Sequence, residues 1–402
     1  MAVSRGSSWS GGVHVNVEAL QSSWRLVERV GDEAVQYFYA HLFLAHPEVR
    51  DMFPIRMTGQ REKFFAALGR IVSNVESLAA DPEFVAQLGR DHRRFGAVGA
   101  HYPAAGASLL ATLAHFLGPR WTDELAQTWT GAYYAVADIM IAAADQASDT
   151  PAWWDAEIVA TERRSVDVTV HTVRPHQPYH YAAGQSLAVE IPQRPRLWRY
   201  FSPANAPRPD GTFDLHVQVV DGGEVSTTFA RQVRPGDQIR LGSPLGNAFQ
   251  VPSDAVDNLL LIAGGSGLAP LRALVDRFAQ ESNHGAVVPR VQLLHGVRTS
   301  WNLYDHESLT ALTDHPWFSY IPVVSEDPGF HGVQGTVGAV AARGRDLTGT
   351  TALVCGSPAM VNATVTALTT AGMPRHAIRF ETFGLPAPAA GPRSTDKVAQ
   401  WM

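Results

Sequence analysis

The stretch Asn258-Leu-Leu-Leu-Ile-Ala-Gly-Gly-Ser-Gly-Leu-Ala-Pro270 is an apolar run that ends in a glycine-rich turn. A helix-length segment, residues 271–280, follows it. Further apolar runs without alternation lie at 291–294, 321–324 and 352–354. Such runs, separated by helix-length segments, predict a parallel sheet that is buried on both faces. We therefore expect an α/β domain over residues 256–385.

The turn contains Gly264, Gly265 and Gly267, where the expected strand becomes a helix. Its backbone can approach a pyrophosphate closely, and amides at the helix N-terminus supply partial positive charge. Pro270 fits the first helical turn, which needs no amide hydrogen. Alone, the turn is equally compatible with a tight strand-to-helix connection. A ligand is favoured because Cys355-Gly356-Ser357-Pro358 follows another buried strand, at the edge where open α/β sheets bind ligands.

Upstream of this domain, apolar residues alternate with polar ones. Residues 166–170 and 213–219 both have a period of two, which is typical of half-buried antiparallel strands. This pattern predicts an antiparallel β-barrel over residues 152–254.

Two segments of the expected barrel carry groups suited to a planar dinucleotide. Arg199-Tyr200-Phe201-Ser202 combines a guanidinium for a phosphate, two aromatic faces and a hydroxyl. Residues 222–227 offer hydrogen-bond donors in a turn that can surround a pyrophosphate. Taken alone, each segment is more simply an ordinary strand with a surface arginine or a hairpin turn.

The first part of the chain has a helical period, as in residues 129–140. Breaks such as Gly118-Pro119 divide it into six to eight helices, and Ser148-Asp149-Thr150-Pro151 ends it. An all-α domain over residues 15–150 is therefore expected.

His92 continues an apolar stripe of Phe84 and Leu88, so its imidazole should point into the helical core. A neutral histidine there is either hydrogen-bonded or bound to a metal. Tyr39 and Gln60 also lie on apolar stripes. One basic nitrogen with two opposing hydrogen-bonding groups fits a haem that carries a diatomic ligand. The alternative is three separate buried polar residues with backbone partners.

Composition excludes several classes of protein. The 402 residues suggest two or three domains, and a formal charge of −6 with both signs interspersed argues against nucleic acid as a partner. A single cysteine excludes an iron–sulphur cluster held by four thiolates and suits a reducing cytoplasm. No apolar stretch approaches the roughly 20 residues of a spanning helix. Residues 1–14 are expected to be a disordered tail and 386–402 a C-terminal tail.

From about Trp153 to Gly384 the chain resembles the ferredoxin-NADP reductase-like flavoenzymes. Arg199-x-Phe201-Ser202 matches their flavin-binding Arg-x-Tyr-Ser motif, residues 222–227 match the flavin-phosphate turn, and residues 264–270 match the nicotinamide-nucleotide loop. Phe201 replaces the usual tyrosine, so a hydroxyl normally available to the flavin is missing. The resemblance implies an FAD-binding barrel and an NAD(P)-binding domain. Residues 355–358 would lie beside the nicotinamide, and residues 381–383 near the flavin ring. The expected FAD and coenzyme residues are Ser186, Arg199, Tyr200, Phe201, Ser202, Gly223, Val225, Ser226, Gly264, Gly265, Ser266, Gly267, Leu268, Ala269, Pro270, Arg298, Cys355, Gly356, Pro358, Glu381, Thr382 and Phe383.

The second strand of the α/β domain ends at residues 295–300, where no Asp or Glu is present to accept a hydrogen bond from a ribose 2′-hydroxyl. Arg298 could instead meet a 2′-phosphate, which favours NADPH slightly. Because Arg298 is equally explained as a solvated loop residue, NADH stays open.

Tyr39, Phe53, Gln60, His92 and Tyr102 make the helical domain resemble the globin part of flavohaemoglobins. The local sequence agrees at Gln60-Arg61-Glu62, at Asp91-His92 and at residues 109–113. The resemblance implies that His92 is the proximal ligand of haem b, with Tyr39 and Gln60 as distal hydrogen-bond donors. Phe53 would pack on the porphyrin, Phe64 is a further expected haem-binding residue, and Tyr102 would be a proximal-side tyrosine.

One family residue is missing. In flavohaemoglobins a glutamate completes a charge-relay network with the proximal tyrosine and histidine, and counting from Tyr133 places Ala144 at its position. Asp145 is adjacent but should face about 100° away. His92 should then donate less electron density to iron, which predicts weaker oxygen activation.

The whole chain resembles flavohaemoglobin, which implies an NAD(P)H-dependent flavohaem oxidoreductase. Electrons would pass from NAD(P)H through FAD to haem, and the favoured interpretation is a nitric oxide dioxygenase that forms nitrate. Expected partners are small molecules: O2, nitric oxide and NAD(P)H. Ala144 and Phe201 favour an NAD(P)H oxidase or a reductase with another acceptor, whereas the retained reductase argues against a haem-based sensor. A thiolate-ligated monooxygenase is disfavoured because Cys355 belongs to a nicotinamide-site motif.

Overall fold

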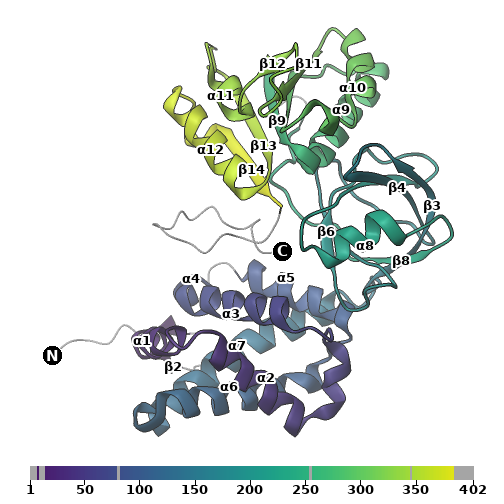
Figure 1. Cartoon of the computed structure of the whole chain (residues 1–402). Helices are drawn as coiled ribbons and strands as arrows, with labels where there is room; N and C mark the ends of the chain where they lie inside the picture. Colours follow the sequence, from purple (N-terminus) through teal and green to yellow (C-terminus); the bar gives the residue numbers. More distant parts are fainter. Residues whose placement is uncertain (1–6, 9–13, 79–81, 253–255, 345, 384–402) are drawn as a thin grey trace. The chain divides into compact units, whose positions relative to one another are not determined.

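The computed structural model describes residues 7–8, 14–78, 82–252, 256–344 and 346–383 (Figure 1). The chain divides into two compact units between Ala152 and Trp153. The first unit is helical, and the second contains a six-stranded antiparallel sheet followed by a six-stranded parallel sheet. The predicted order of an all-α domain, an antiparallel β-barrel and an α/β domain is confirmed. Within the described residues, no helix is long and apolar enough to cross a membrane.

Seven α-helices lie in the described part of the first unit. They are α1 (Val17–Glu28), α2 (Asp32–Ala45), α3 (Thr58–Ser73), α4 (Val75–Leu78), α5 (Glu83–His92), α6 (Tyr102–Leu117) and α7 (Asp123–Gln146). Most of the expected N-terminal tail lies outside the described residues. Ser7–Ser8 of that segment forms β1, which pairs antiparallel with β2 (His14–Val15).

Helices α5 and α7 approach each other at backbone distance. A Cβ atom at Gly89 would lie 2.2 Å from the carbonyl oxygen of Met140, which is closer than any real contact. Only glycine lets the two helices pack this closely. The contact therefore fixes the position of α5, whose last residue is His92.

The antiparallel sheet has the strand order β6-β5-β8-β3-β4-β7. Its strands are β3 (Trp154–Arg163), β4 (Val168–Pro175), β5 (Leu187–Glu190), β6 (Arg199–Phe201), β7 (Phe213–Gln218) and β8 (Gln238–Leu241). An isolated bridge between Pro203 and Leu215 brings the chain after β6 beside β7, so the sheet is nearly closed into a barrel. Phe213 and Phe229, the latter on α8 (Glu224–Gln232), fill its core.

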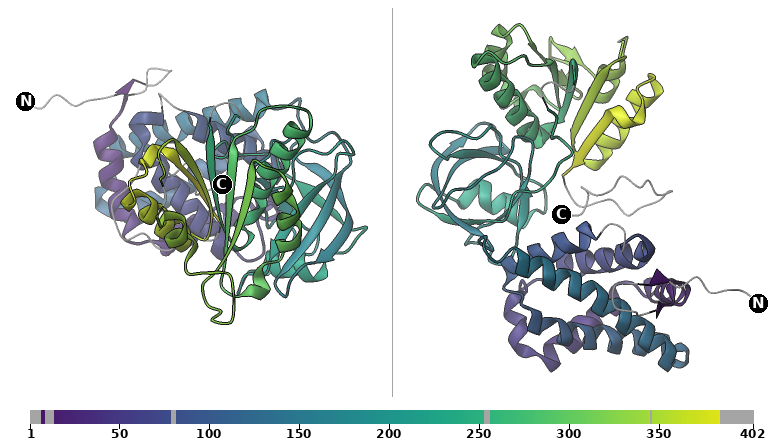
Figure 2. Two further views of the ribbon diagram at one scale, coloured as in Figure 1. Left: turned by 90° about the horizontal axis from the view of Figure 1, so that it is seen from above. Right: turned by 180° about the vertical axis from the view of Figure 1, so that it is seen from behind.

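The parallel sheet has the strand order β12-β11-β10-β9-β13-β14 (Figures 1 and 2). Its strands are β9 (Asn258–Gly264), β10 (Arg290–Val297), β11 (Phe318–Val324), β12 (Val333–Gln334), β13 (Thr350–Gly356) and β14 (Ile378–Thr382). The chain moves outward from β9 to β12 and then returns to the other side of β9 at β13. Ligands of open α/β sheets bind at such a reversal, beyond the carboxyl ends of the strands.

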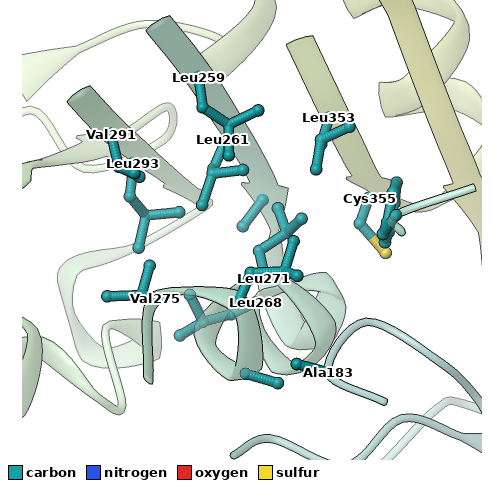
Figure 3. Close-up of a cluster of buried hydrophobic side chains, with 14 of the residues drawn as sticks. Ala183, Leu259, Leu261, Leu268, Leu271, Val275, Val291, Leu293, Leu353 and Cys355 are labelled. Carbon is teal, nitrogen blue, oxygen red and sulfur yellow. The ribbon is translucent and has the colours of Figure 1, made fainter. Parts of the chain in front are cut away.

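Both faces of the parallel sheet are covered, which explains its uninterrupted apolar runs. Leu259 and Leu261 face α9 (Leu268–Asn283), and Figure 3 shows their side chains directed toward Leu268 and Leu271 of this helix. The intervening residues Leu260 and Ile262 belong to a second cluster. That cluster includes residues of α11 (Val337–Ala342) and α12 (Pro358–Thr370). Alternate residues of one strand therefore pack on opposite layers.

Candidate active site

Tyr39 on α2 and Gln60 on α3 meet inside the helical unit. The Nε2 atom of Gln60 donates a hydrogen bond of 3.3 Å to the hydroxyl oxygen of Tyr39. The Tyr39 ring is 5% exposed and has edge contacts with the rings of Phe53 and Phe64, at centroid distances of 5.4 and 5.7 Å. Four residues predicted for the haem pocket are thus brought together by the fold.

The hydroxyl group of Tyr39 keeps its proton at neutral pH. Burial raises its pKa to about 12, although the hydrogen bond from Gln60 acts in the opposite direction. Because Gln60 already donates to the oxygen, the proton of the hydroxyl is directed elsewhere. The pair can therefore offer one hydrogen bond to a ligand in the surrounding aromatic pocket.

His92 is held by its own helix. Its Nδ1 atom lies 2.6 Å from the carbonyl oxygen of Leu88. A carbonyl oxygen only accepts, so Nδ1 carries the proton and Nε2 keeps the lone pair that a metal needs. Burial lowers the pKa of His92, which keeps the ring neutral. The imidazole thus fits the predicted role of an iron ligand.

On the proximal side, the carboxylate next to His92 in the sequence forms its hydrogen bonds with other residues. The carboxylate of Asp91 accepts hydrogen bonds from Gln87 and Arg94, each at 3.2 Å. Within the described residues, no carboxylate is hydrogen-bonded to the His92 ring or to the Tyr102 hydroxyl. Ala144 lies in the last turn of α7, and its neighbour Asp145 is exposed. A backbone carbonyl therefore stands where an acidic acceptor would strengthen the ligand.

Residues predicted to bind the flavin lie on β6 and at the start of α8. Arg199, Tyr200 and Phe201 form β6, and Ser202 follows it. The hydroxyl of Ser202 is buried without a hydrogen-bond partner, so it is available to a bound molecule. The Phe201 ring contacts the Phe229 ring edge-on at 5.4 Å. A polar flavin edge would satisfy the Ser202 hydroxyl, so this region fits FAD.

Residues 222–227 differ from the simple turn that the sequence predicts. Gly222 is in a left-handed conformation with φ +72°, and α8 then begins at Glu224 with Gly223 as its N-cap. The donors here are therefore amides at a helix N-terminus, which is a stronger anion site than a turn. Val225 is buried in the barrel core and fixes the helix there. Ser186, the remaining predicted flavin residue, exchanges backbone hydrogen bonds with Leu245 just before β5.

The glycine-rich turn lies between β9 and α9. A Cβ atom at Gly267 would lie 2.3 Å from the carbonyl oxygen of Cys355, so the turn packs on the end of β13. The helix begins at Leu268, which places Pro270 in its first turn, as predicted. The turn and the Cys355 segment are far apart in the chain, yet they form one edge of the sheet.

Ser357 and Pro358 open α12 in the predicted way. The side chain of Ser357 caps the helix by accepting a hydrogen bond from the amide of Met360, and Pro358 is the first helical residue. The amide of Phe383 donates to the carbonyl oxygen of Gly356 at 3.0 Å. Thr382 and Phe383 thus lie beside the same edge.

Cys355 and Glu381 are neighbours on β13 and β14. Burial raises the pKa of Glu381 to about 7. It also raises the pKa of the Cys355 thiol, with a further contribution from Glu381, so the thiol stays protonated. A Cβ atom at Gly246 would lie 3.3 Å from Oε1 of Glu381, which brings this carboxyl group next to a loop of the barrel.

Sequence reasoning missed three residues around this edge. The side chains of Gln218 and His295 contact the turn at Ser266 and Gly265, at 3.2 and 3.1 Å. Glu326 follows β11, and its amide donates a 2.7 Å hydrogen bond to the carbonyl oxygen of Arg298. Gln218 ends an alternating strand, and His295 directly follows the apolar run 291–294 within β10, so the signals were present. Their partners depend on strand order, which the sequence pattern does not specify.

Three family models match the chain in succession. Residues 36–140 match the globin model, 155–249 the oxidoreductase FAD-binding domain, and 261–366 the oxidoreductase NAD-binding domain. The three matches correspond to the helical domain, the barrel and the parallel-sheet domain.

Individual relatives agree with this division. A flavohaemoprotein of Rhizobium meliloti is 27% identical over 295 residues, which are 67% of this chain and 71% of that protein. The reductase component of phenol 2-monooxygenase from Pseudomonas sp. is 32% identical over 224 residues, which are 54% of this chain and 62% of that protein. The crystal structure of a flavohaemoglobin from Malassezia yamatoensis, with bound FAD and haem, shares the fold. Its TM-score is 0.73 at 18% identity, over 91% of this chain and 99% of that one. The chain therefore belongs to the flavohaemoglobins, in which a globin domain precedes FAD-binding and NAD-binding oxidoreductase domains.

Proposed function

We propose that this chain is a nitric oxide dioxygenase, which takes electrons from NAD(P)H and converts nitric oxide and O2 to nitrate at a haem held by His92. The observation that carries the proposal is the neutral His92, with a free Nε2, in the same unit as the Tyr39–Gln60 pair. Bound FAD would accept a hydride and release single electrons, and haem iron would bind the diatomic ligands.

In the helical unit, His92 would hold the iron, and Tyr39 and Gln60 would contact the distal ligand. His92 offers Nε2 because the Leu88 carbonyl fixes the proton on Nδ1. The Tyr39 hydroxyl donates a proton in a hydrogen bond, and Gln60 holds its oxygen. Such a donor would stabilise a diatomic ligand in the pocket once haem is bound there.

In the second unit, the turn between β9 and α9 would hold the coenzyme pyrophosphate through its amides. The buried thiol of Cys355 and carboxyl group of Glu381 border the place proposed for the nicotinamide, and both are neutral below about pH 7. Neutral groups beside the nicotinamide would stabilise its ring little when the loss of hydride makes the ring positively charged. Glu381, however, can lose its proton near neutral pH and then stabilise that charge.

We propose NADH as the better coenzyme, which differs from the slight NADPH preference expected from the second strand alone. Arg298 is a cation available to a 2′-phosphate, but the backbone amide of Glu326 donates to its carbonyl oxygen and Asp327 accepts hydrogen bonds from Ser300, so an acidic segment adjoins this loop. Carboxylates in a segment that adjoins the coenzyme loop disfavour a 2′-phosphate and can accept hydrogen bonds from ribose hydroxyls. We expect kcat/KM to be about tenfold higher with NADH, and Glu326→Gln to reduce that ratio.

A reductase that serves another acceptor is the second candidate. The specific observation in its favour is the backbone carbonyl behind His92 together with Ala144, which predicts weak oxygen activation. We also infer a cytoplasmic location, because a single buried thiol suits a reducing compartment.

Anaerobic visible spectra, recorded before and after NADH and in parallel with NADPH, test the proposal. The reduced protein is then mixed with O2 and nitric oxide, and nitrate is assayed. Haem reduction followed by stoichiometric nitrate supports the dioxygenase. Flavin bleaching with a haem that stays ferric, or turnover without nitrate, supports the second candidate instead.

A further inference from the structure

We propose that Asp167 and Gln218 of the barrel position the coenzyme turn, so that the barrel and the parallel sheet act as one site for hydride transfer. Both are positioning residues, which act through the backbone of Gly265 and Ser266. The inference rests on the proposed function, because the turn has this role only in a chain that uses NAD(P)H.

The turn is held from two sides by uncharged side chains. The amide of Ser266 donates to Oε1 of Gln218 at 3.2 Å, and Nε2 of His295 lies 3.1 Å from the carbonyl oxygen of Gly265. Gly265 has φ +53°, and a Cβ atom there would lie 3.1 Å from Oε1 of Gln218. The turn therefore rests directly on a barrel side chain, although it belongs to the parallel sheet.

Asp167 determines the orientation of the Gln218 side-chain amide, that is, which of its Nε2 and Oε1 atoms faces the coenzyme turn. Nε2 of Gln218 donates a 2.7 Å hydrogen bond to Oδ2 of Asp167. Burial alone would raise the pKa of Asp167, but hydrogen bonds from Gln218, Ser165 and Asn302 lower it, so the group is an ionised acceptor. An ionised carboxylate only accepts. The NH2 group of Gln218 must then face Asp167, and its carbonyl oxygen must face Ser266.

The same carboxylate reaches the next loop of the sheet. Oδ1 of Asp167 accepts from Nδ2 of Asn302 at 3.3 Å. Asn302 ends the short helical turn that follows β10 and Arg298. One barrel carboxylate therefore connects the turn after β9 with the loop after β10, the two segments proposed for the pyrophosphate and adenosine parts of the coenzyme.

A second buried contact holds the far end of that loop. Asp305 is 3% exposed and forms ion pairs with Arg164 of the barrel segment after β3 and with Arg272 of α9. The loop after β10 is thus fastened to the barrel near Asn302 and again at Asp305. A barrel that binds the flavin and also fixes both coenzyme loops sets the distance over which hydride moves, and transfer is sensitive to that distance.

The competing explanation is that Gln218 merely occupies an amide that the pyrophosphate needs. Removing its side chain would then free the Ser266 amide and tighten coenzyme binding. The two explanations predict changes of opposite sign, so one substitution separates them.

The test compares the full-length holoprotein with Gln218→Met, Asp167→Asn and the double variant. Asp210→Asn is the matched control, because Asp210 is an exposed barrel carboxylate whose hydrogen bonds with the described residues come from Thr212 in its own turn. Binding of ADP-ribose by calorimetry reports on the turn without turnover. Reduction of ferricyanide by NADH reports KM and kcat without the haem, and thermal melting monitors folding.

We expect the Kd for ADP-ribose and the KM for NADH to rise about tenfold in each single variant, and the control to stay unchanged. In the double variant, Kd and KM should rise by less than the product of the two single increases, because Asp167 acts partly through Gln218. Unchanged or tighter ADP-ribose binding in Gln218→Met overturns the proposal. If the parent protein binds ADP-ribose but reduces nothing with NADH or NADPH, the proposed function fails, while the binding series still tests the turn.

Discussion

The sites of the two units differ in how their titratable groups are held. In the helical unit, burial raises the pKa of Tyr39 to about 12 and lowers that of His92, so neither group changes charge near neutral pH. In the second unit, burial raises the pKa of Glu381 to about 7. Tyr39 and His92 of the haem-binding unit thus each keep one protonation state, whereas the reductase unit contains a carboxyl group that exchanges its proton at neutral pH.

The largest expected effect comes from His92→Ala, which breaks the helical half of this comparison alone. Without the Nε2 lone pair, the chain should lose haem reduction by NADH completely. Ferricyanide reduction should change by less than about twofold, because this assay does not need the haem and His92 belongs to the other unit. Anaerobic spectra measure haem reduction, and steady-state assays measure ferricyanide reduction. A variant that still shows an NADH-reduced haem would refute the assignment of His92.

Tyr39→Phe removes the distal donor and keeps the ring. The rate of oxygen dissociation should rise about ten- to a hundredfold, the range for one hydrogen bond to a charged group. Stopped-flow displacement of oxygen measures this rate. Tyr37→Phe is the control, since Tyr37 lies on the same helix but stacks on His115. Equal effects of both substitutions would exclude a specific role for Tyr39.

Glu381→Gln sharpens the other half of the comparison. The pKa of Glu381 rises from 4.5 in the unfolded chain to about 7 on folding, so the folded chain holds an extra proton between these values. Stability is therefore lost as the pH rises through this window. The variant stays neutral, so its free energy of unfolding should exceed the parent's by at most about 3 kcal/mol above pH 7, and by nothing below pH 4.5. Denaturant unfolding at several pH values measures the two free energies of unfolding. A difference between variant and parent that does not change with pH would contradict the raised pKa of Glu381.

Ala144→Glu should have the smallest effect. A carboxylate behind the proximal side should increase the imidazolate character of His92 and raise nitrate formation a few-fold. Resonance Raman spectroscopy should then show a higher iron–histidine stretching frequency. Asp145→Asn, at the adjacent exposed position, should leave both unchanged. If Ala144→Glu raises neither quantity, the missing glutamate does not explain weak activation.

Periodicity alone predicted the three domains, because helical, alternating and continuous apolar patterns each suit one kind of layer. The runs at Leu259 and Val291 are uninterrupted since α-helices cover both faces of their sheet. The helix that begins at Glu224 was missed because Gly222-Gly223 signals a turn and α8 is only nine residues long.

The candidate site was predictable where one segment carries several of its groups. Residues 199–202 and 264–270 are of this kind. The contacts of Gln218 and Asp167 were not, because they join segments whose proximity depends on tertiary packing. Glu326 was missed for the same reason: it follows β11, which lies beside β10 only once the strand order is known. The roles assigned to individual residues remain predictions.

The single cysteine lets the rate of thiol modification report how often the segment around it opens. Cys355 is fully buried at the coenzyme edge, and its thiol is protonated. A thiol reagent can react only when the end of β13 opens and the thiolate forms. The modification rate therefore measures the frequency of this local opening. Since the chain contains no second thiol, the measurement needs no introduced label and no correction for modification at other sites.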